Sequence, residues 1–206
     1  DVVAKMRGIL GQKKVGHTGT LDPEAEGVLP VCAGKGTKLC DMLTDHDKMY
    51  RATLLLGTDT DTQDTTGTVL AKKSTEGLSE EAVREAILSF IGNYDQIPPM
   101  YSALKVNGRK LCDLAREGIV VERKARPVTI YDIRIEEICL PEVVMTVSCS
   151  KGTYIRTLCH DIGEKLSVGG CMKTLLRTKV DRFLIEDSLT LAELQKRKDE
   201  GRLSEA

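Results

Sequence analysis

The stretch between residues 16 and 31, GHTGTLDPEAEGVLPV, constrains the fold of this chain more than any other part. Its first half carries glycines, threonines and an Asp-Pro step, which are typical of tight turns. Because Pro23 disfavours helical geometry in the residue before it, Asp22 is predicted on an extended loop. The second half, from Gly27, is predicted as a short buried strand. A loop fixed against a rigid strand is a common place for a reactive group, although Asp before Pro is also an ordinary turn former.

Helical and strand patterns follow each other without regular β-α-β alternation. Apolar spacing predicts helices near residues 2–10, 80–91, 153–166 and 191–198. Strands are predicted near residues 48–56, 128–138, 143–150 and 176–183. This order predicts an α+β fold with a mixed, mostly antiparallel central sheet flanked by helices. The 206 residues suit a single domain, residues 1–206, with an insertion at about 95–126.

Charge and cysteine usage limit the classes of protein that fit. The net charge is −1, but seven basic and three acidic residues lie between Lys105 and Arg126, and a second basic run lies between Lys173 and Arg182. Two such runs are consistent with a phosphate-binding surface as well as with solvated faces. No apolar run approaches the length of a membrane span, so no membrane partner is expected. The seven cysteines form no C-x-x-C pair, which favours reduced thiols, most of them in the core, in a cytoplasmic protein.

Two further loops resemble ligand-binding motifs but lack residues that those motifs require. Gly34-Lys35-Gly36-Thr37 opens a short helix and suits a phosphate, but it lacks the first glycine and the Ser or Thr of a Walker A loop. The loop at 57–67, GTDTDTQDTTG, lacks the central glycine and closing glutamate of an EF-hand. Neither nucleotide hydrolysis nor a metal site is therefore predicted.

Several stretches, in order, resemble signatures of the TruB family of tRNA pseudouridine synthases, bacterial type. The stretch at 16–31 is similar to the family loop G-H-x-G-T-L-D-P-x-A-x-G-V-L. KMY at 48–50, the loop at 57–67 and CSKGTYIRTL at 149–158 also match. GGCMKTLLRT at 169–178 is similar to G-A-H-x-x-x-L-R-R-T, with departures at Cys171 and Leu176. The resemblance implies a pseudouridine synthase fold whose insertion is a thumb that clamps an RNA stem-loop.

The resemblance implies three catalytic residues. Asp22 is the expected catalytic aspartate, and Arg156 is expected to form an ion pair with it. A neighbouring cation keeps a carboxylate ionised, as a nucleophilic Asp requires. From residue types alone, Arg156 could instead pair with a surface acid. It follows Ile155 directly in the predicted helix, so it points away from the apolar stripe that contains Ile155. Tyr154 is expected near the base, where it could assist proton transfer.

The expected binding residues come from other parts of the chain. The resemblance implies that Tyr50 and Leu175 enclose a flipped uracil and that His17 helps to hold the opened loop. Without that context, Tyr50 reads as a half-buried strand tyrosine and His17 as a structural histidine. Contacts with RNA phosphates are predicted for Lys35, Lys105, Arg109, Arg123, Lys173 and Arg177.

The implied reaction isomerises uridine-55 in the T-loop of tRNA to pseudouridine. The glycosidic bond breaks, the uracil turns, and it rejoins the ribose through carbon, without cofactor or metal. The implied partner is the T-arm stem-loop of tRNA, bound by a monomer. Base flipping costs a few kcal/mol, to be offset by salt-sensitive phosphate contacts. The thumb-like insertion favours stand-alone recognition over dependence on a guide RNA.

Two alternatives stay open at this point. One is a non-catalytic RNA-binding or tRNA-folding protein on the same scaffold. The other is a nucleoside or glycoside hydrolase, although such enzymes usually need a second carboxylate across the substrate. Members of the family often carry an upstream strand with a Lys-Pro-x-Gly turn and a C-terminal RNA-binding domain, and both are expected to be missing from residues 1–206.

Overall fold

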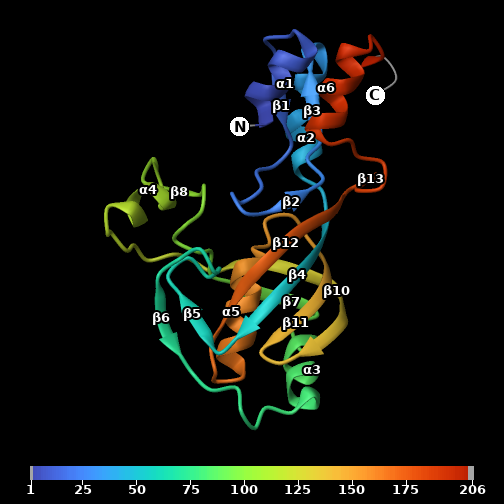
Figure 1. Ribbon diagram of the computed structural model, residues 1–206. Helices are drawn as coiled ribbons and strands as arrows, with labels where there is room; N and C mark the ends of the chain where they lie inside the picture. Colours follow the sequence, from blue (N-terminus) through green and yellow to red (C-terminus); the bar gives the residue numbers. More distant parts are fainter. Residues whose placement is uncertain (1, 204–206) are drawn as a thin grey trace. The chain divides into compact units, whose positions relative to one another are not determined.

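The computed structural model describes residues 2–203, and the chain divides into two compact units. Unit 1 comprises residues 1–49 and 176–206, and unit 2 comprises residues 50–175 (Figure 1). The unit boundaries fall inside strands β4 (Lys48–Leu56) and β12 (Gly170–Val180), so both strands continue from one unit into the other. The division into one catalytic domain stays a prediction.

Unit 1 gathers the two ends of the described chain. Its elements are α1 (Val2–Leu10), β1 (Val15–His17), β2 (Glu26–Gly27), β3 (Val31–Ala33), the 3-10 helix η1 (Gly34–Leu39), α2 (Cys40–Thr44), β13 (Phe183–Leu184) and α6 (Leu191–Asp199). Met6, Ile9 and Val15 form its core, and Leu191 and Leu194 of α6 pack against them. Thr190 and Glu193 cap α6 reciprocally, which satisfies backbone donors at its start. The two terminal helices predicted from periodicity are thus confirmed.

The predicted buried strand from Gly27 is wrong. In its place, β2 pairs in parallel with β12, whereas β3 pairs antiparallel with β1. Gly27 has a φ of +111°, which is incompatible with a continuous strand, and Pro30 between the two strands has no N–H to donate. The chain therefore changes partner between residues 27 and 31.

Unit 2 is built around most of the seven-stranded sheet. Its remaining elements are β5 (Thr58–Thr60), β6 (Val69–Lys72), α3 (Glu80–Leu88), β7 (Gly92–Gln96), β8 (Lys105–Val106), β9 (Arg109–Lys110), α4 (Leu111–Arg116), β10 (Arg126–Cys139), β11 (Glu142–Cys149) and α5 (Ile155–Lys165). Six strands follow the order β13-β12-β4-β11-β10-β7, and β2 is the seventh, paired with β12. Strand β10 is antiparallel to both β11 and β7. Alternate residues of β11 are buried, as expected for a sheet with one covered face. The mixed sheet with helices α3 and α5 confirms the predicted α+β fold (Figure 1).

Strand β12 begins at Gly170, six positions before the predicted start at Leu176. The early part is hidden from sequence patterns by Gly169 and Gly170, which lower strand propensity. A Cβ on Gly170 would lie 2.9 Å from the Cys159 carbonyl oxygen of α5, and a Cβ on Gly169 would collide with the carboxylate of Asp59. Close approach of α5 therefore explains Gly170, and the Asp59 side chain explains Gly169.

The insertion has a small core of its own, formed by Met100, Leu111 and Leu114. Strands β8 and β9 form a hairpin around Asn107 and Gly108, whose positive φ values of 51° and 81° suit a two-residue turn. Helix α4 follows the hairpin, and Gly118, with a φ of 74°, lies just beyond its end. The insertion thus carries a folded unit rather than an irregular loop.

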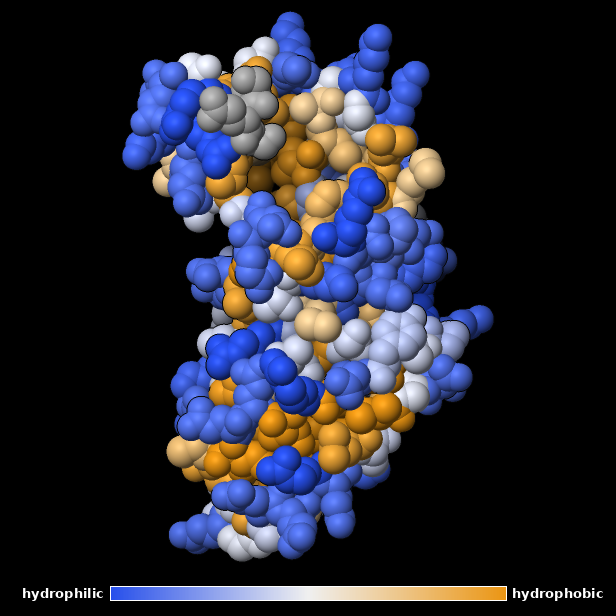
Figure 2. Space-filling model, turned by 90° about the vertical axis from the view of Figure 1, so that its right-hand side faces the viewer, coloured by the Kyte–Doolittle hydropathy of each residue, from blue (hydrophilic) through white to orange (hydrophobic). Residues whose placement is uncertain are grey.

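The surface is mostly polar, with some apolar exposure. Figure 2 shows hydrophobic residues exposed on unit 2, and Leu70, Leu88 and Ile91 are among its exposed apolar side chains. In Figure 2 the hydrophobic residues of unit 2 are gathered in one area on the lower part of the view, and a large apolar share of the accessible surface is ordinary for a folded protein. Only Cys149, Cys159 and Cys171 of the seven free cysteines are buried, so the expectation that most lie in the core is wrong. None of the described helices combines the length and apolar character needed to cross a bilayer.

Candidate active site

Asp22 lies in the turn predicted from the Asp-Pro step. The backbone carbonyl of Asp22 accepts a hydrogen bond of 2.9 Å from the N–H of Ala25, which closes a turn with Pro23 in its second position. The Asp22 side chain is half-buried, and the residue lies in the segment that connects β1 to β2. A short, closed turn of this kind holds a carboxylate in a narrow range of positions.

The loop around Asp22 is held by Arg177. Arg177 is 1% exposed; its Nε donates to the Val28 carbonyl at 2.7 Å and its Nη2 to the Gly19 carbonyl at 3.3 Å. In return, the Val28 N–H donates to the Arg177 carbonyl at 2.8 Å. A Cβ on Gly27 would lie 2.1 Å from that carbonyl oxygen, so only glycine fits there. Such burial does not fit the predicted contact of Arg177 with an RNA phosphate: its guanidinium is a structural anchor.

His17 and Lys35 lie elsewhere in unit 1. His17 ends β1 and is half-buried; its Nδ1 is buried and has no hydrogen-bond partner among residues 2–203. The next residue, Thr18, is fully buried and its N–H donates to the Pro30 carbonyl at 3.1 Å. Lys35 is exposed on η1. The unmet hydrogen-bonding capacity of His17 Nδ1 is therefore enclosed by protein atoms.

Arg156 is buried in unit 2, at the start of α5. Its side chain donates to the Thr62 carbonyl at 3.1 Å and to the Tyr101 carbonyl at 2.9 Å. Its Nη1 also lies 3.7 Å from Oδ2 of Asp64, and the residue is 5% exposed. The loop at 57–67 therefore positions this arginine, a role that sequence reasoning missed.

The loop itself is organised by Asp64. Oδ1 of Asp64 accepts hydrogen bonds from the Thr66 N–H at 3.0 Å and from the Thr62 hydroxyl at 2.7 Å. Carboxylates often close turns through bonds to a nearby backbone N–H, which is the signal that the spacing Thr62-x-Asp64-x-Thr66 contains. The predicted ion pair between Asp22 and Arg156 stays a prediction.

Tyr154 is the N-cap residue of α5, and buried Gln96 holds its backbone. The Tyr154 N–H donates to Oε1 of Gln96 at 2.8 Å, and Nε2 of Gln96 donates to the Tyr154 carbonyl at 3.0 Å. The same Nε2 bonds to the hydroxyl of Tyr94, which donates to Asp161 at 2.7 Å. Burial raises the pKa of both Tyr94 and Asp161. This network fixes the start of the helix that carries Arg156.

Tyr50 and Leu175 share the covered face of the sheet. Thr53 and Thr174 are hydrogen-bonded at 2.7 Å on the exposed face. Because successive strand residues point to opposite faces, Tyr50 and Leu175 point to the other one, and they are 8% and 9% exposed. An aromatic and an aliphatic side chain on one face of adjacent strands suit an apolar base-binding surface.

The predicted RNA-binding cations of unit 2 differ in their surroundings. Lys105 is exposed on β8. Arg109 pairs with Glu117, and Lys173 pairs with Glu142 at 2.5 Å, so both would have to leave a carboxylate to meet phosphate. Arg123 is half-buried and donates to the Pro98 carbonyl at 3.1 Å. Within the described residues, no group of three or more His, Cys, Asp or Glu side chains could hold a metal ion.

Two family models match the chain. The first, TruB family pseudouridylate synthase (N terminal domain), covers residues 7–155. The second, tRNA pseudouridylate synthase B C-terminal domain, covers residues 156–205. The boundary between them coincides with the start of α5.

The chain is also similar to curated relatives and to solved structures. It is 54% identical to tRNA pseudouridine synthase B of Alkaliphilus oremlandii, with 95% of this chain and 65% of the relative aligned. The corresponding protein of Lachnoclostridium phytofermentans is 59% identical, with 95% and 66% aligned. The chain thus spans about two thirds of the length of these relatives.

Among solved structures, a chain of a Cbf5-Nop10-Gar1 complex superposes with a TM-score of 0.73 at 31% identity, over 97% of this chain and 52% of that one. A chain of an H/ACA RNP bound to a substrate RNA containing 2'-deoxyuridine gives a TM-score of 0.72 at 29% identity, over 97% and 50%. The folds therefore agree over almost the full length of this chain. Since the first family model covers most of the chain and the curated relatives share more than half of the aligned residues, the chain belongs to the TruB family of pseudouridylate synthases.

Proposed function

We propose that this chain is a tRNA pseudouridine synthase, an isomerase that converts uridine-55 of the T-loop to pseudouridine. The observation that carries the proposal is the signature loop, which is intact in sequence and is held around Asp22 by the buried Arg177. Family membership and the identity to tRNA pseudouridine synthase B support it.

The proposed chemistry begins at the carboxylate of Asp22. It adds to the ribose anomeric carbon or to the pyrimidine ring, and in either case the bond between ribose and N1 breaks. The uracil then turns and C5 forms the new bond to ribose. The bond to Asp22 breaks, which regenerates the carboxylate, and the C5 proton leaves to a base or to water. Arg156 keeps Asp22 ionised for this attack, because a nearby cation favours the charged form of a carboxylate. Tyr154, fixed through Gln96, assists the proton transfer.

The base reaches the carboxylate by flipping out of the T-loop. Tyr50 and Leu175 hold it between them, and His17 helps to hold the opened loop. Exposed Lys35 and Lys105 contact phosphates directly. Arg109 and Lys173 contact phosphates only after their ion pairs with Glu117 and Glu142 break. Because these contacts replace condensed counterions, binding falls steeply with salt.

A second candidate is a subunit that acts only within an assembly with other proteins or RNA. It is favoured by the likeness to a chain of a Cbf5-Nop10-Gar1 complex and to a chain of an H/ACA RNP. The higher identity to tRNA pseudouridine synthase B favours action by the chain alone on tRNA. Incubation of the protein alone with RNA separates the two.

The test uses an unmodified tRNA transcript and a second transcript in which uridine-55 is replaced by cytidine. After incubation with the protein alone, nucleoside digestion and chromatography measure pseudouridine. We expect product from the first transcript and none from the second. Equal product from both would contradict uridine-55 as the modified position. No product from either would contradict the proposal that the protein acts alone on tRNA.

A further inference from the structure

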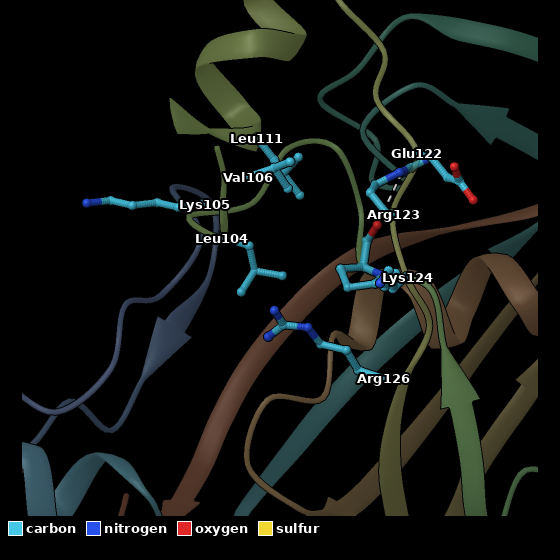
Figure 3. Close-up of a pocket in the computed structure, with 9 residues that line it drawn as sticks. Leu104, Lys105, Val106, Leu111, Glu122, Arg123, Lys124 and Arg126 are labelled. Atoms are coloured by element: carbon cyan, nitrogen blue, oxygen red, sulfur yellow. Dashed lines mark hydrogen bonds between the residues drawn. The ribbon is translucent and has the colours of Figure 1, made fainter. Parts of the chain in front are cut away.

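The insertion contains a hollow that the proposed catalytic residues do not use. Its volume is about 230 Å³, and it is lined by residues 98–126 of unit 2 (Figure 3). One part of the lining is apolar, from Pro98, Leu104, Val106 and Leu111. We call this hollow the thumb pocket.

The charged side chains that line the pocket are mostly positive. Cations line the pocket together with one acid, and that acid, Glu122, points away from Leu104 and Arg126 in Figure 3. The cations are Lys105, Arg123, Lys124 and Arg126. Such a cluster attracts an anion.

Two arginines elsewhere in the insertion are neutralised locally, whereas Lys110 is exposed and forms no ion pair within residues 2–203. Arg109 pairs with Glu117, and Arg116 pairs with Asp113 at 3.3 Å. By contrast, no ion pair of Lys105, Lys124 or Arg126 occurs within residues 2–203. The uncompensated charge of the insertion is therefore concentrated at the thumb pocket.

Arg123 adds an unused donor to the same place. Its Nη1 is fixed by the Pro98 carbonyl, but its Nε is buried and has no hydrogen-bond partner in the described part of the chain. Buried polar groups are normally hydrogen-bonded, and an exception calls for an explanation. An oxygen atom of a ligand would complete this group.

The apolar wall is held in place by the core of the insertion. Leu111 is 1% exposed within that core, and Leu104 and Val106 pack against it. Figure 3 shows Leu104 between this wall and the guanidinium of Arg126. A ligand that fits both parts has an apolar face and an anionic group. The volume lies below the roughly 300–1,000 Å³ of drug-sized sites, which suits a single nucleobase.

We propose that the thumb pocket receives one unpaired nucleotide of the bound RNA, with its base on Leu104 and its phosphate at Lys124 and Arg126. This rests on the proposed function, because it takes the T-arm stem-loop as the RNA. It adds a subsite for a second nucleotide, separate from the uridine that reacts.

The experiment combines changes in the protein with changes in the RNA. A set of T-arm stem-loops carries an abasic site at each loop position in turn, and a second set carries a neutral methylphosphonate there. Dissociation constants are measured by fluorescence anisotropy for the native protein, Leu104→Ala and Arg126→Gln. Arg84→Gln, an exposed arginine on α3, controls for the loss of one positive charge.

At one loop position, the abasic site should weaken binding to the native protein about tenfold. The same abasic site should weaken binding to Leu104→Ala by less than about twofold, because that variant has already lost the contact between the base and Leu104. Arg126→Gln should abolish the effect of the methylphosphonate at that position, and Arg84→Gln should leave both effects in place. Arg126 is exposed, so its variant keeps the test valid if Leu104→Ala disturbs the insertion.

The proposal would be overturned if the effects of the protein substitutions and of the RNA changes on binding were additive at every loop position. Displacement of the stem-loop by free 5′-UMP near the dissociation constant of the stem-loop would also overturn it, because this would indicate a small-molecule site. Pseudouridine formation is measured in parallel. Product with additive binding effects would overturn the pocket alone, whereas coupled effects without product would support the pocket and overturn the proposed enzyme.

Discussion

Two loops of this protein, one in each unit, each contact one buried arginine. In unit 1, Arg177 donates to the carbonyls of Val28 and Gly19 and forms no ion pair with any carboxylate of residues 2–203. In unit 2, Arg156 also donates to two carbonyls, but Asp64 lies 3.7 Å from its guanidinium. The first arrangement fixes backbone alone, whereas in the second a carboxylate also faces the guanidinium. The two arginines are similarly buried and differ in whether a carboxylate is among their partners.

The largest effect is expected from Gly27→Ala, which attacks the anchored loop. Its Cβ would lie 2.1 Å from the Arg177 carbonyl oxygen at a φ of +111°, so backbone must move. We expect a loss of about 4 kcal/mol in the free energy of unfolding, measured by denaturant titration. Gly36→Ala is the control, because nothing lies within 4 Å of its Cβ, and should change stability by less than about 0.5 kcal/mol. Equal stability of both variants would contradict the tight contact.

Next in size is the contrast between Arg177→Lys and Arg156→Lys. Lysine keeps the charge but cannot reach two carbonyls at once, so Arg177→Lys should lose about 2–3 kcal/mol of stability. Arg156→Lys should lose less stability and more kcat in pseudouridine formation. Denaturant unfolding and single-turnover rates measure the two effects. A larger stability loss in Arg156→Lys than in Arg177→Lys would reverse the comparison.

A smaller effect is expected from Asp64→Asn. The amide oxygen can still accept from the Thr66 N–H, but the charge facing Arg156 is lost, at a cost of about 1–2 kcal/mol. Asp61→Asn in the same loop is the matched control, since Asp61 accepts from the Thr68 N–H at 2.7 Å. Stability and kcat are both measured. Asp64→Asn should lower kcat well below the control, and equal kcat would show that the carboxylate does not aim Arg156.

The smallest effect concerns a carboxylate outside both loops. Arg51 and then Thr146 donate to Glu136 at 2.7 Å each, and these bonds lower the pKa of Glu136 from 4.5 to about 2. A lowered pKa stabilises the fold above pH 4.5, and this contribution is lost as pH falls from 4.5 through about 2. Glu136→Gln should cost about 1 kcal/mol at pH 7, a modest value because the site is near solvent. The difference from the native protein should shrink as pH falls towards 2; a constant difference would contradict the assignment.

Sequence patterns predicted the parts of the fold that local spacing determines. The helix at 2–10 and the strand at 48–56 agree with the structure. The turn at Asp22 follows in the same way from Pro23. These features depend on neighbours only a few residues apart.

The missed features depend on contacts between distant residues. Arg177 looked like a surface cation because its run is basic, but its burial comes from pairing with Gly27, far earlier in the chain. The early start of β12 depends on close contact with Gly163 of α5. The role of Asp64 required the position of Arg156, which no local pattern contains. In each case the long-range partner carries the information.

The most direct test of the proposed function is Asp22→Asn, compared with Glu24→Gln in the same turn. Both remove one negative charge, and Glu24 is exposed. Binding of an unmodified tRNA transcript and its pseudouridine content after incubation are measured for the native protein and both variants. We expect equal binding by all three, product from the native protein and Glu24→Gln, and none from Asp22→Asn. Product from Asp22→Asn at the native rate would contradict Asp22 as the reacting group.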